Sequence, residues 1–111
     1  MEERRAFERY PVVVGSDVAA NGTEISFGLT QDLSRGGARL LTQGKYAAGS
    51  RLNLQIHIDK SNVIKLTATV IRAVAVTDRG MWQNEIGVRF DELLADDLVN
   101  TLRELASKLG W

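Results

Sequence analysis

Apolar and polar side chains alternate along much of the chain with a period of two residues. The clearest run covers residues 51–58, where Leu52, Leu54, Ile56 and Ile58 occupy every second position. Strands with one buried face and one face in water produce this pattern, which is typical of antiparallel sheet. We expect the apolar positions of such runs to face the core. Three further groups repeat the alternation: Ile25, Phe27 and Leu29; Ile64, Leu66, Ala68 and Val70; and Ile86, Val88 and Phe90.

Turn-forming residues separate the alternating runs and set the number of strands. About six short strands at this spacing predict a small barrel or sandwich. Pro11, the only proline, biases Tyr10 towards an extended backbone and marks the entry into the first strand. The turn signals are Asn21-Gly22, Gly36-Gly37, Gly49-Ser50, Lys60-Ser61-Asn62 and Asp78-Arg79-Gly80.

The period changes near the end of the chain, where leucines recur at helical spacing. The pattern predicts an amphipathic helix over residues 91–110, with Asp91 as its N-cap and Gly110 at its end. The leucine stripe would cover either the β-structure or a partner chain. Its members follow at steps of four, four, three and four: Leu94, Leu98, Leu102, Leu105 and Leu109.

Composition limits the class of protein. The chain has 111 residues, 44% of them hydrophobic and 25% charged, which predicts a single globular domain over residues 1–111. The formal net charge is zero, from 14 basic and 14 acidic side chains. This balance argues against a broad electrostatic grip on DNA, RNA or an anionic membrane. The absence of cysteine excludes disulfides, thiolate metal sites and cysteine nucleophiles.

The sequence also limits where the protein is located and whether it is an enzyme. No run approaches the roughly 18 apolar residues of a membrane-spanning helix, and the charged start does not resemble a signal peptide. We therefore expect a cytoplasmic protein without membrane insertion. The single histidine, His57, takes a polar position in an alternating run and is expected at the surface. Because no carboxylate is spaced to pair with a nucleophile or with metal ligands, we expect neither an enzyme nor a resident cofactor or metal.

The first nine residues are almost wholly charged, with Phe7 as the one large apolar side chain. Such a stretch buries little surface and is expected to form a mobile arm. Within it, Arg5 and Arg9 are four apart. A guanidinium matches phosphate oxygens and also the O6 and N7 acceptors of guanine. Taken alone, the spacing is common by chance and favours a solvated tail.

A second candidate element covers residues 32–37. Asp32 can accept hydrogen bonds from N1 and N2 of guanine, and Ser34 can donate one to a phosphate oxygen. Gly36 and Gly37 permit close approach of a ligand and backbone angles closed to other residues. Asp, Ser and Gly are also the expected residues of a tight turn between two strands, so this second interpretation stays open. The element is expected on a rim of the β-structure, where it could face the N-terminal arm.

Three segments together resemble the PilZ domain family. They are residues 4–12, which contain the arginine pair, residues 32–38, with the run Asp-Leu-Ser-Arg-Gly-Gly-Ala, and residues 86–90, which end in Gly-x-x-Phe. They occur in the family order and at family-like distances over essentially the whole chain. The resemblance implies a mainly β fold, a six-stranded antiparallel β-barrel with a C-terminal α-helix. The arm would then be residues 1–9, the barrel residues 10–90 and the helix residues 91–110.

The resemblance also implies a ligand, cyclic di-GMP, bound at one rim of the barrel. The arginines of the first motif would clamp phosphates and guanine edges, and the second motif would complete the contacts. In the family, the residue at the position of Arg4 is linked to whether one ligand or a stacked pair binds, and an arginine favours the stacked pair. The candidate ligand-binding residues are Arg4, Arg5, Arg9, Asp32, Ser34, Gly36 and Gly37.

The leading interpretation is a cyclic di-GMP receptor that signals when its arm orders on the ligand and it contacts a downstream protein partner. The alternative is a PilZ-fold protein-interaction adaptor that binds no nucleotide and uses the helix and Trp111 as its contact surface. A nucleic acid polymer is not an expected partner, given the neutral charge and few aromatic residues (two Trp, two Tyr, three Phe). Monomer and homodimer both stay open, because the leucine stripe suits either.

Overall fold

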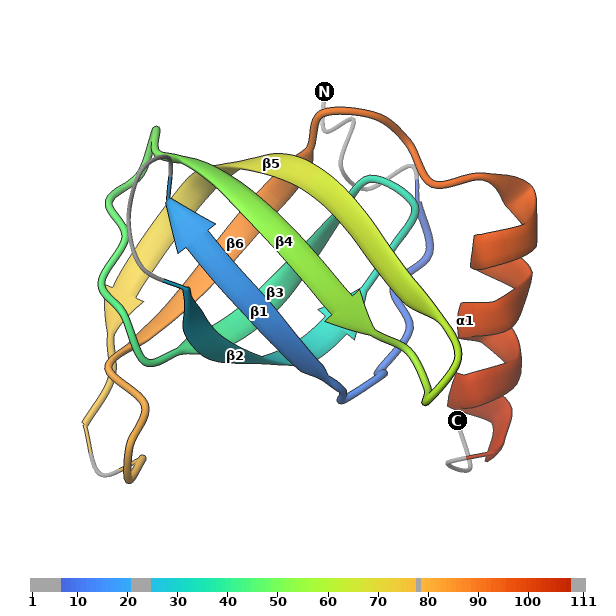
Figure 1. Cartoon of the computed structure of the whole chain (residues 1–111), viewed down its shortest axis with the longest axis horizontal. Helices are drawn as coiled ribbons and strands as arrows, with labels where there is room; N and C mark the ends of the chain where they lie inside the picture. Colours follow the sequence, from blue (N-terminus) through green and yellow to red (C-terminus); the bar gives the residue numbers. More distant parts are fainter. Residues whose placement is uncertain (1–6, 21–24, 78, 109–111) are drawn as a thin grey trace.

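The described part of the chain forms a closed barrel of six strands, followed by one helix (Figure 1). The computed structural model describes residues 7–20, 25–77 and 79–108. The strands pair in the order β1-β2-β3-β6-β5-β4, every pair is antiparallel, and β4 closes onto β1. This confirms the predicted barrel with a C-terminal helix. In chain order the elements are β1 (Gly15–Ala20), β2 (Ser26–Leu33), β3 (Gly37–Thr42), β4 (Arg51–His57), β5 (Val63–Ala75), β6 (Asn84–Phe90) and α1 (Asp96–Lys108).

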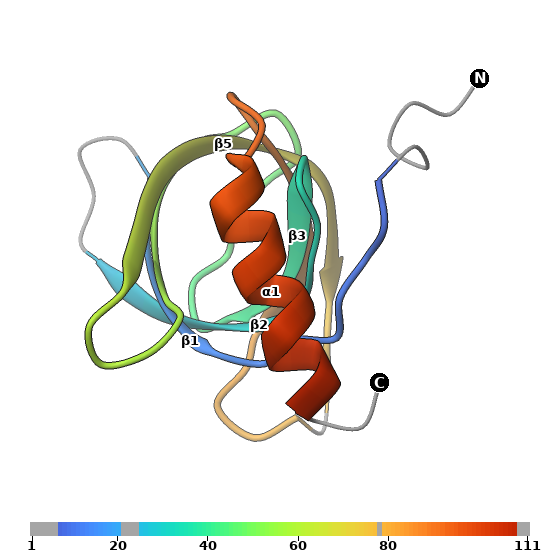
Figure 2. The ribbon, with the colours of Figure 1, turned by 90° about the vertical axis from the view of Figure 1, so that its right-hand side faces the viewer.

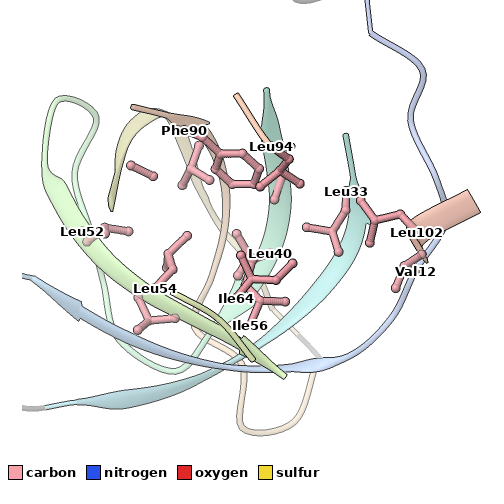
Figure 3. Close-up of a cluster of buried hydrophobic side chains, with 14 of the residues drawn as sticks. Val12, Leu33, Leu40, Leu52, Leu54, Ile56, Ile64, Phe90, Leu94 and Leu102 are labelled. Atoms are coloured by element: carbon pink, nitrogen blue, oxygen red, sulfur yellow. The ribbon is translucent and has the colours of Figure 1, made fainter. Parts of the chain in front are cut away.

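The barrel interior is an apolar core filled by alternate residues of the strands (Figure 3). On β4, Leu52, Leu54 and Ile56 are buried while Arg51 and Asn53 are exposed, as the period-two pattern predicts. Burying one such aliphatic side chain stabilises the fold by about 2 kcal/mol relative to leaving it in water, and this decides which face turns inward. The same prediction is confirmed on β6, where the buried residues include Ile86, Val88 and Phe90.

β2 turns inward the face opposite to the one predicted from its apolar residues. Ile25 and Phe27 are 66% and 42% exposed, whereas Gly28 and Thr30 are buried. Packing explains the glycine, because a Cβ there would lie 2.9 Å from a valine methyl group of β1. Hydrogen bonding explains the threonine, whose hydroxyl donates to the carbonyl of Val12 at 2.7 Å inside the barrel. The expectation that the apolar residues of this strand face the core is therefore wrong.

A register shift in the pairing of β2 with β3 restores the alternation before β2 ends. The shift falls between Thr30 and Asp32. In a regular strand, residues two apart face the same side, so Asp32 would follow Thr30 into the core. The extra residue, Gln31, reverses the phase, so that Leu33 is buried and Asp32 lies on the outside of the barrel. The irregularity thus places the carboxylate of the second motif on the outside of the barrel.

The helix begins at Asp96 rather than at Asp91, which was the predicted N-cap. The carboxylate of Asp91 instead accepts hydrogen bonds from the Thr67 hydroxyl and the Arg51 guanidinium, so it serves the barrel end. α1 has 13 residues with acidic side chains in its first turn and Lys108 in its last, as the helix dipole favours. Within the described residues, no helix is long and apolar enough to cross a membrane.

The leucine stripe of the C-terminal segment covers the barrel. α1 lies across one end of the barrel (Figures 1 and 2). Leu94 and Leu102 are buried in the core, and Leu98 and Leu105 are partly buried against it. The stripe is therefore not free for a partner chain along these residues. Residues 109–111, with the last leucine, the expected helix end at Gly110 and Trp111, lie outside the described residues.

Candidate functional site

The turn between β2 and β3 is held at the barrel rim by backbone hydrogen bonds from two other elements. At the end of β6, the N–H of Phe90 donates to the Gly36 carbonyl at 2.8 Å. Ahead of α1, the N–H of Leu94 donates to the Arg35 carbonyl at 2.9 Å. The turn is thus fixed to both the barrel and the segment that leads into the helix, and its side chains keep defined directions.

The Ser34 hydroxyl is engaged inside this turn. Its Oγ accepts the N–H groups of Gly37 at 3.1 Å and Gly36 at 3.3 Å, and the hydroxyl donates to the Gly37 carbonyl at 3.3 Å. The backbone N–H of Ser34 donates to the same carbonyl at 2.9 Å. These bonds support the tight-turn interpretation of the motif directly. A phosphate contact by this hydroxyl stays a prediction.

Gly36 and Gly37 allow neighbouring groups to approach the backbone closely. They do not adopt unusual backbone angles. Among the described residues, the glycines with positive φ are Gly49 and Gly80, so the expected special angles at the motif glycines are wrong. A Cβ on Gly37 would lie 2.4 Å from the carbonyl oxygen of Val88 on β6, far inside van der Waals contact. Gly37 is therefore required for β3 and β6 to pair at the rim.

The segment ahead of β1 runs back to the rim and brings one arginine of the first motif to the second motif. Tyr10 forms an isolated antiparallel bridge with Leu33, with its N–H donating to the Leu33 carbonyl at 2.7 Å. One residue earlier, Arg9 Nη1 donates to Oδ1 of Asp32 at 3.2 Å. The two motifs, separated in sequence, thus meet through Arg9 and Asp32.

Phe7 approaches the same turn from the same segment. A Cβ on Gly36 would lie 3.1 Å from two atoms of the Phe7 ring and 3.6 Å from Cδ2 of Leu93. The glycine therefore leaves room for both side chains to lie against the turn. Arg4 and Arg5, the remaining candidates of the first motif, lie outside the described residues.

Asp32 lies between two guanidinium groups. Arg9 reaches Oδ1, and Nε of Arg39, on β3, lies 3.3 Å from Oδ2. The same Nε is 3.7 Å from Oε2 of Glu85 on β6. The Asp32 side chain is only 14% exposed, whereas those of Arg9 and Arg39 are 55% and 46% exposed. The carboxylate is largely covered, and the two cations remain open to an anionic ligand.

The strand register extends this cluster across the outside of the barrel. Asp32 pairs with Arg39, Arg39 with Gly87, and Gly87 with Arg72, so one row crosses β2, β3, β6 and β5. Arg89 takes the next outward position of β6, and its side chain, like that of Arg72, is exposed. The surface beside the rim is therefore locally rich in arginine, although the net charge of the chain is zero.

Arg35, which lies inside the second motif, points to the helix. Its guanidinium forms an ion pair with Asp96, the first residue of α1. Its Nε is buried without a hydrogen-bond partner. Sequence reasoning assigned no role to Arg35 or Arg39. Arg39 could have been suggested by its polar position directly after the motif, but its pairing with Asp32 depends on the strand register.

The site places guanidinium donors around one carboxylate acceptor. Within the described residues, no group of three or more His, Cys, Asp or Glu side chains could hold a metal ion. His57 lies on the outside of β4, as predicted, with its Nε2 3.1 Å from Oδ2 of Asp17 on β1. The His57–Asp17 pair lies on β4 and β1, whereas the strand residues of the cluster around Asp32 lie on β2, β3 and β6.

Comparison with known families identifies the class of protein. The PilZ domain family matches residues 3–108, nearly the whole chain. The chain therefore belongs to the PilZ domain family. A comparison with curated proteins found no match.

Solved structures share the fold at low sequence identity. The PilZ domain of YcgR from Escherichia coli with c-di-GMP has a TM-score of 0.70 and 16% identity, and the match covers 97% of this chain and 92% of that one. Bacillus subtilis inhibitor of motility (MotI/DgrA) has a TM-score of 0.71 and 19% identity, with coverages of 97% and 52%. The K. pneumonia MrkH–c-di-GMP complex has a TM-score of 0.68 and 16% identity, with coverages of 98% and 53%. The chain thus spans about half the length of the last two proteins.

Proposed function

We propose that this chain is a cyclic di-GMP receptor that acts as an effector in bacterial second-messenger signalling. The observation that carries the proposal is the contact of Arg9 with Asp32, which joins the two motifs at the rim of a PilZ barrel. The similar YcgR domain and MrkH are both described as complexes with c-di-GMP. Arg4, Arg5, Ser34, Gly36 and Gly37 belong to the proposed site through the family resemblance.

The cluster suits a guanine base next to a phosphate. The N1–H and N2–H groups of guanine can donate to the two oxygens of Asp32, while Arg9 can donate to a phosphate or to the Hoogsteen edge of guanine. Arg9 and Asp32 already touch, so Arg9 gives up this contact where it turns to a phosphate of the ligand. An ion pair with one partner this exposed contributes about 0–1 kcal/mol, so the exchange is not costly.

Local charge favours a compact anion over a polymer. Arg9, Arg39, Arg72 and Arg89 share the outer surface beside the rim with the carboxylates of Asp32 and Glu85. Four cations against two acids leave a surplus that attracts the two phosphates of a cyclic dinucleotide. The rest of the chain offsets that surplus, since the formal net charge is zero.

The decisive experiment is a titration of the full chain with cyclic di-GMP by calorimetry, with light scattering to follow the mass. We expect micromolar or tighter binding, and cyclic di-AMP to bind far more weakly. With Arg4 stacking on a second guanine, the ligand-to-chain ratio should be about two. No heat, together with no displacement of a labelled cyclic di-GMP probe, would contradict the proposed function.

We also propose that ligand binding orders the N-terminal arm. The Phe7 ring lies against Gly36 and anchors the arm beside the site. The arm therefore loses less conformational entropy when Arg9 binds the ligand. Phe7→Ala is expected to weaken cyclic di-GMP binding about fivefold, measured by calorimetry, with little change in melting temperature.

Phe27→Ala is the matched control for the arm, because this exposed phenylalanine lies at the start of β2, at the opposite end of the barrel from the turn. It should leave the affinity unchanged. If Phe7→Ala binds as tightly as the wild-type chain, or more tightly, the ring does not assist the arm.

The second candidate function, a protein-interaction adaptor, is favoured by a different surface from the one predicted. The leucine stripe packs against the barrel. Phe27 and Trp82, by contrast, stack on the outside of the barrel with ring centroids 5.9 Å apart. Met81 beside them is exposed. Absence of cyclic di-GMP binding would favour this function, and a receptor could use the same surface to contact its partner.

A further inference from the structure

We propose that Arg39 is a positioning residue for the guanine-reading carboxylate of Asp32. The role rests on the proposed function, since it concerns how the same site recognises cyclic di-GMP. Neither motif contains Arg39, which follows the second motif on β3. The geometry that points to this role is the division of the two Asp32 oxygens between two arginines.

Each oxygen of Asp32 has its own guanidinium. Arg9 Nη1 lies 3.2 Å from Oδ1, and Arg39 Nε lies 3.3 Å from Oδ2. A carboxylate oxygen can accept two hydrogen bonds, so each oxygen keeps capacity for a guanine donor. The two ion-pair contacts, one on each oxygen, restrain the orientation of the carboxylate.

The two arginines differ in how firmly they are held. Arg39 is within β3 and pairs in register with Asp32 on one side and with Gly87 on the other. Arg9 precedes β1, next to Tyr10, whose backbone bridges to Leu33, and it has no strand neighbour of its own in the described sheet. When Arg9 turns from Asp32 to the ligand, Arg39 remains beside Asp32 because it is held within β3. Arg39 is then the cation that orients the carboxylate.

The orientation matters because guanine presents two parallel donors. Both N1–H and N2–H must meet the carboxylate in one plane, and a rotated carboxylate would satisfy only one of them. Without Arg39, Asp32 could also turn fully towards Arg9 and form a closed ion pair that competes with the ligand. In this role Arg39 acts through Asp32, so its loss should weaken binding without a direct contact between Arg39 and the ligand.

A double-mutant cycle with Asp32→Ala tests this role, using titrations with cyclic di-GMP up to millimolar concentration. Arg39→Gln is expected to weaken binding about tenfold in the wild-type chain and less than about twofold in the Asp32→Ala background. Arg39→Lys keeps the charge but loses the planar Nε, so it should resemble Arg39→Gln rather than the wild-type chain. Arg79→Gln removes the same charge from the β5–β6 hairpin, at the far end of the barrel, and should leave the affinity unchanged.

The outcomes separate the inference from the proposed function. If wild-type protein fails to bind, the proposed function is wrong and the positioning role with it. Tight wild-type binding with no loss in Arg39→Gln overturns the positioning role alone. An equal loss in both backgrounds, or an Arg39→Lys variant that binds like the wild-type chain, would assign Arg39 to direct contact or to general charge attraction. Where the Asp32→Ala affinity is too weak to measure, the Arg39→Lys comparison decides.

Discussion

Asp32→Ala is expected to lower the affinity for cyclic di-GMP about a hundredfold while the barrel stays folded. The variant loses the acceptor that we propose for two guanine donors, each contact a charge-assisted hydrogen bond. Stability should change little, because the arginine partners of Asp32 are about half exposed and such ion pairs contribute about 0–1 kcal/mol. Calorimetric titration gives the affinity, and thermal unfolding gives the stability of the same sample.

The sign of the Asp32→Ala effect is as informative as its size. Removing this carboxylate frees Arg9 and Arg39 and raises the local positive charge. A ligand attracted by its phosphates alone would then bind as tightly as before, or more tightly. Only a ligand whose base is read by Asp32 should bind more weakly. Asp17→Ala, which removes a carboxylate from the outside of β1, is the matched control and should leave binding unchanged.

The barrel was largely predictable because burial dictates strict alternation where a strand has one wet face. Residues 51–58 follow this rule, and their leucines and isoleucines are buried as predicted. β2 does not, because its interior positions are chosen by fit to a neighbouring strand at Gly28 and by internal hydrogen bonds at Thr30. Those constraints come from residues distant in sequence, so periodicity alone inverted the faces of this strand.

The candidate site was predictable as a set of residue types but not as a geometry. The motif identified Asp32, but its outward direction depends on the register shift after Thr30, which no local pattern reveals. Arg39 becomes its partner only through the pairing of β2 with β3. Arg35, which had no role assigned from the sequence, pairs with Asp96 of α1. Such contacts are set by the tertiary arrangement, which sequence spacing does not encode.

Gly37→Ala is expected to destabilise the protein by about 3 kcal/mol, a drop in melting temperature on the order of 15 °C. The new Cβ would lie 2.4 Å from the carbonyl oxygen of Val88. That oxygen belongs to the backbone of β6 and cannot rotate away as a side chain would, so the pairing of β3 with β6 must open at the rim. Ligand binding should weaken as well, because the turn that carries Ser34 and Gly36 is attached at this point.

Gly87→Ala provides the matched control for Gly37→Ala on the neighbouring strand. There an added Cβ would lie 3.9 Å from Cγ1 of Ile71 and 4.0 Å from Cβ of Arg72, which is ordinary contact. Since alanine restricts the unfolded chain more than glycine, this variant should be as stable as the wild type or more stable by about 0.5 kcal/mol. Equal melting temperatures for the two variants would show that the barrel relaxes around the Gly37 position.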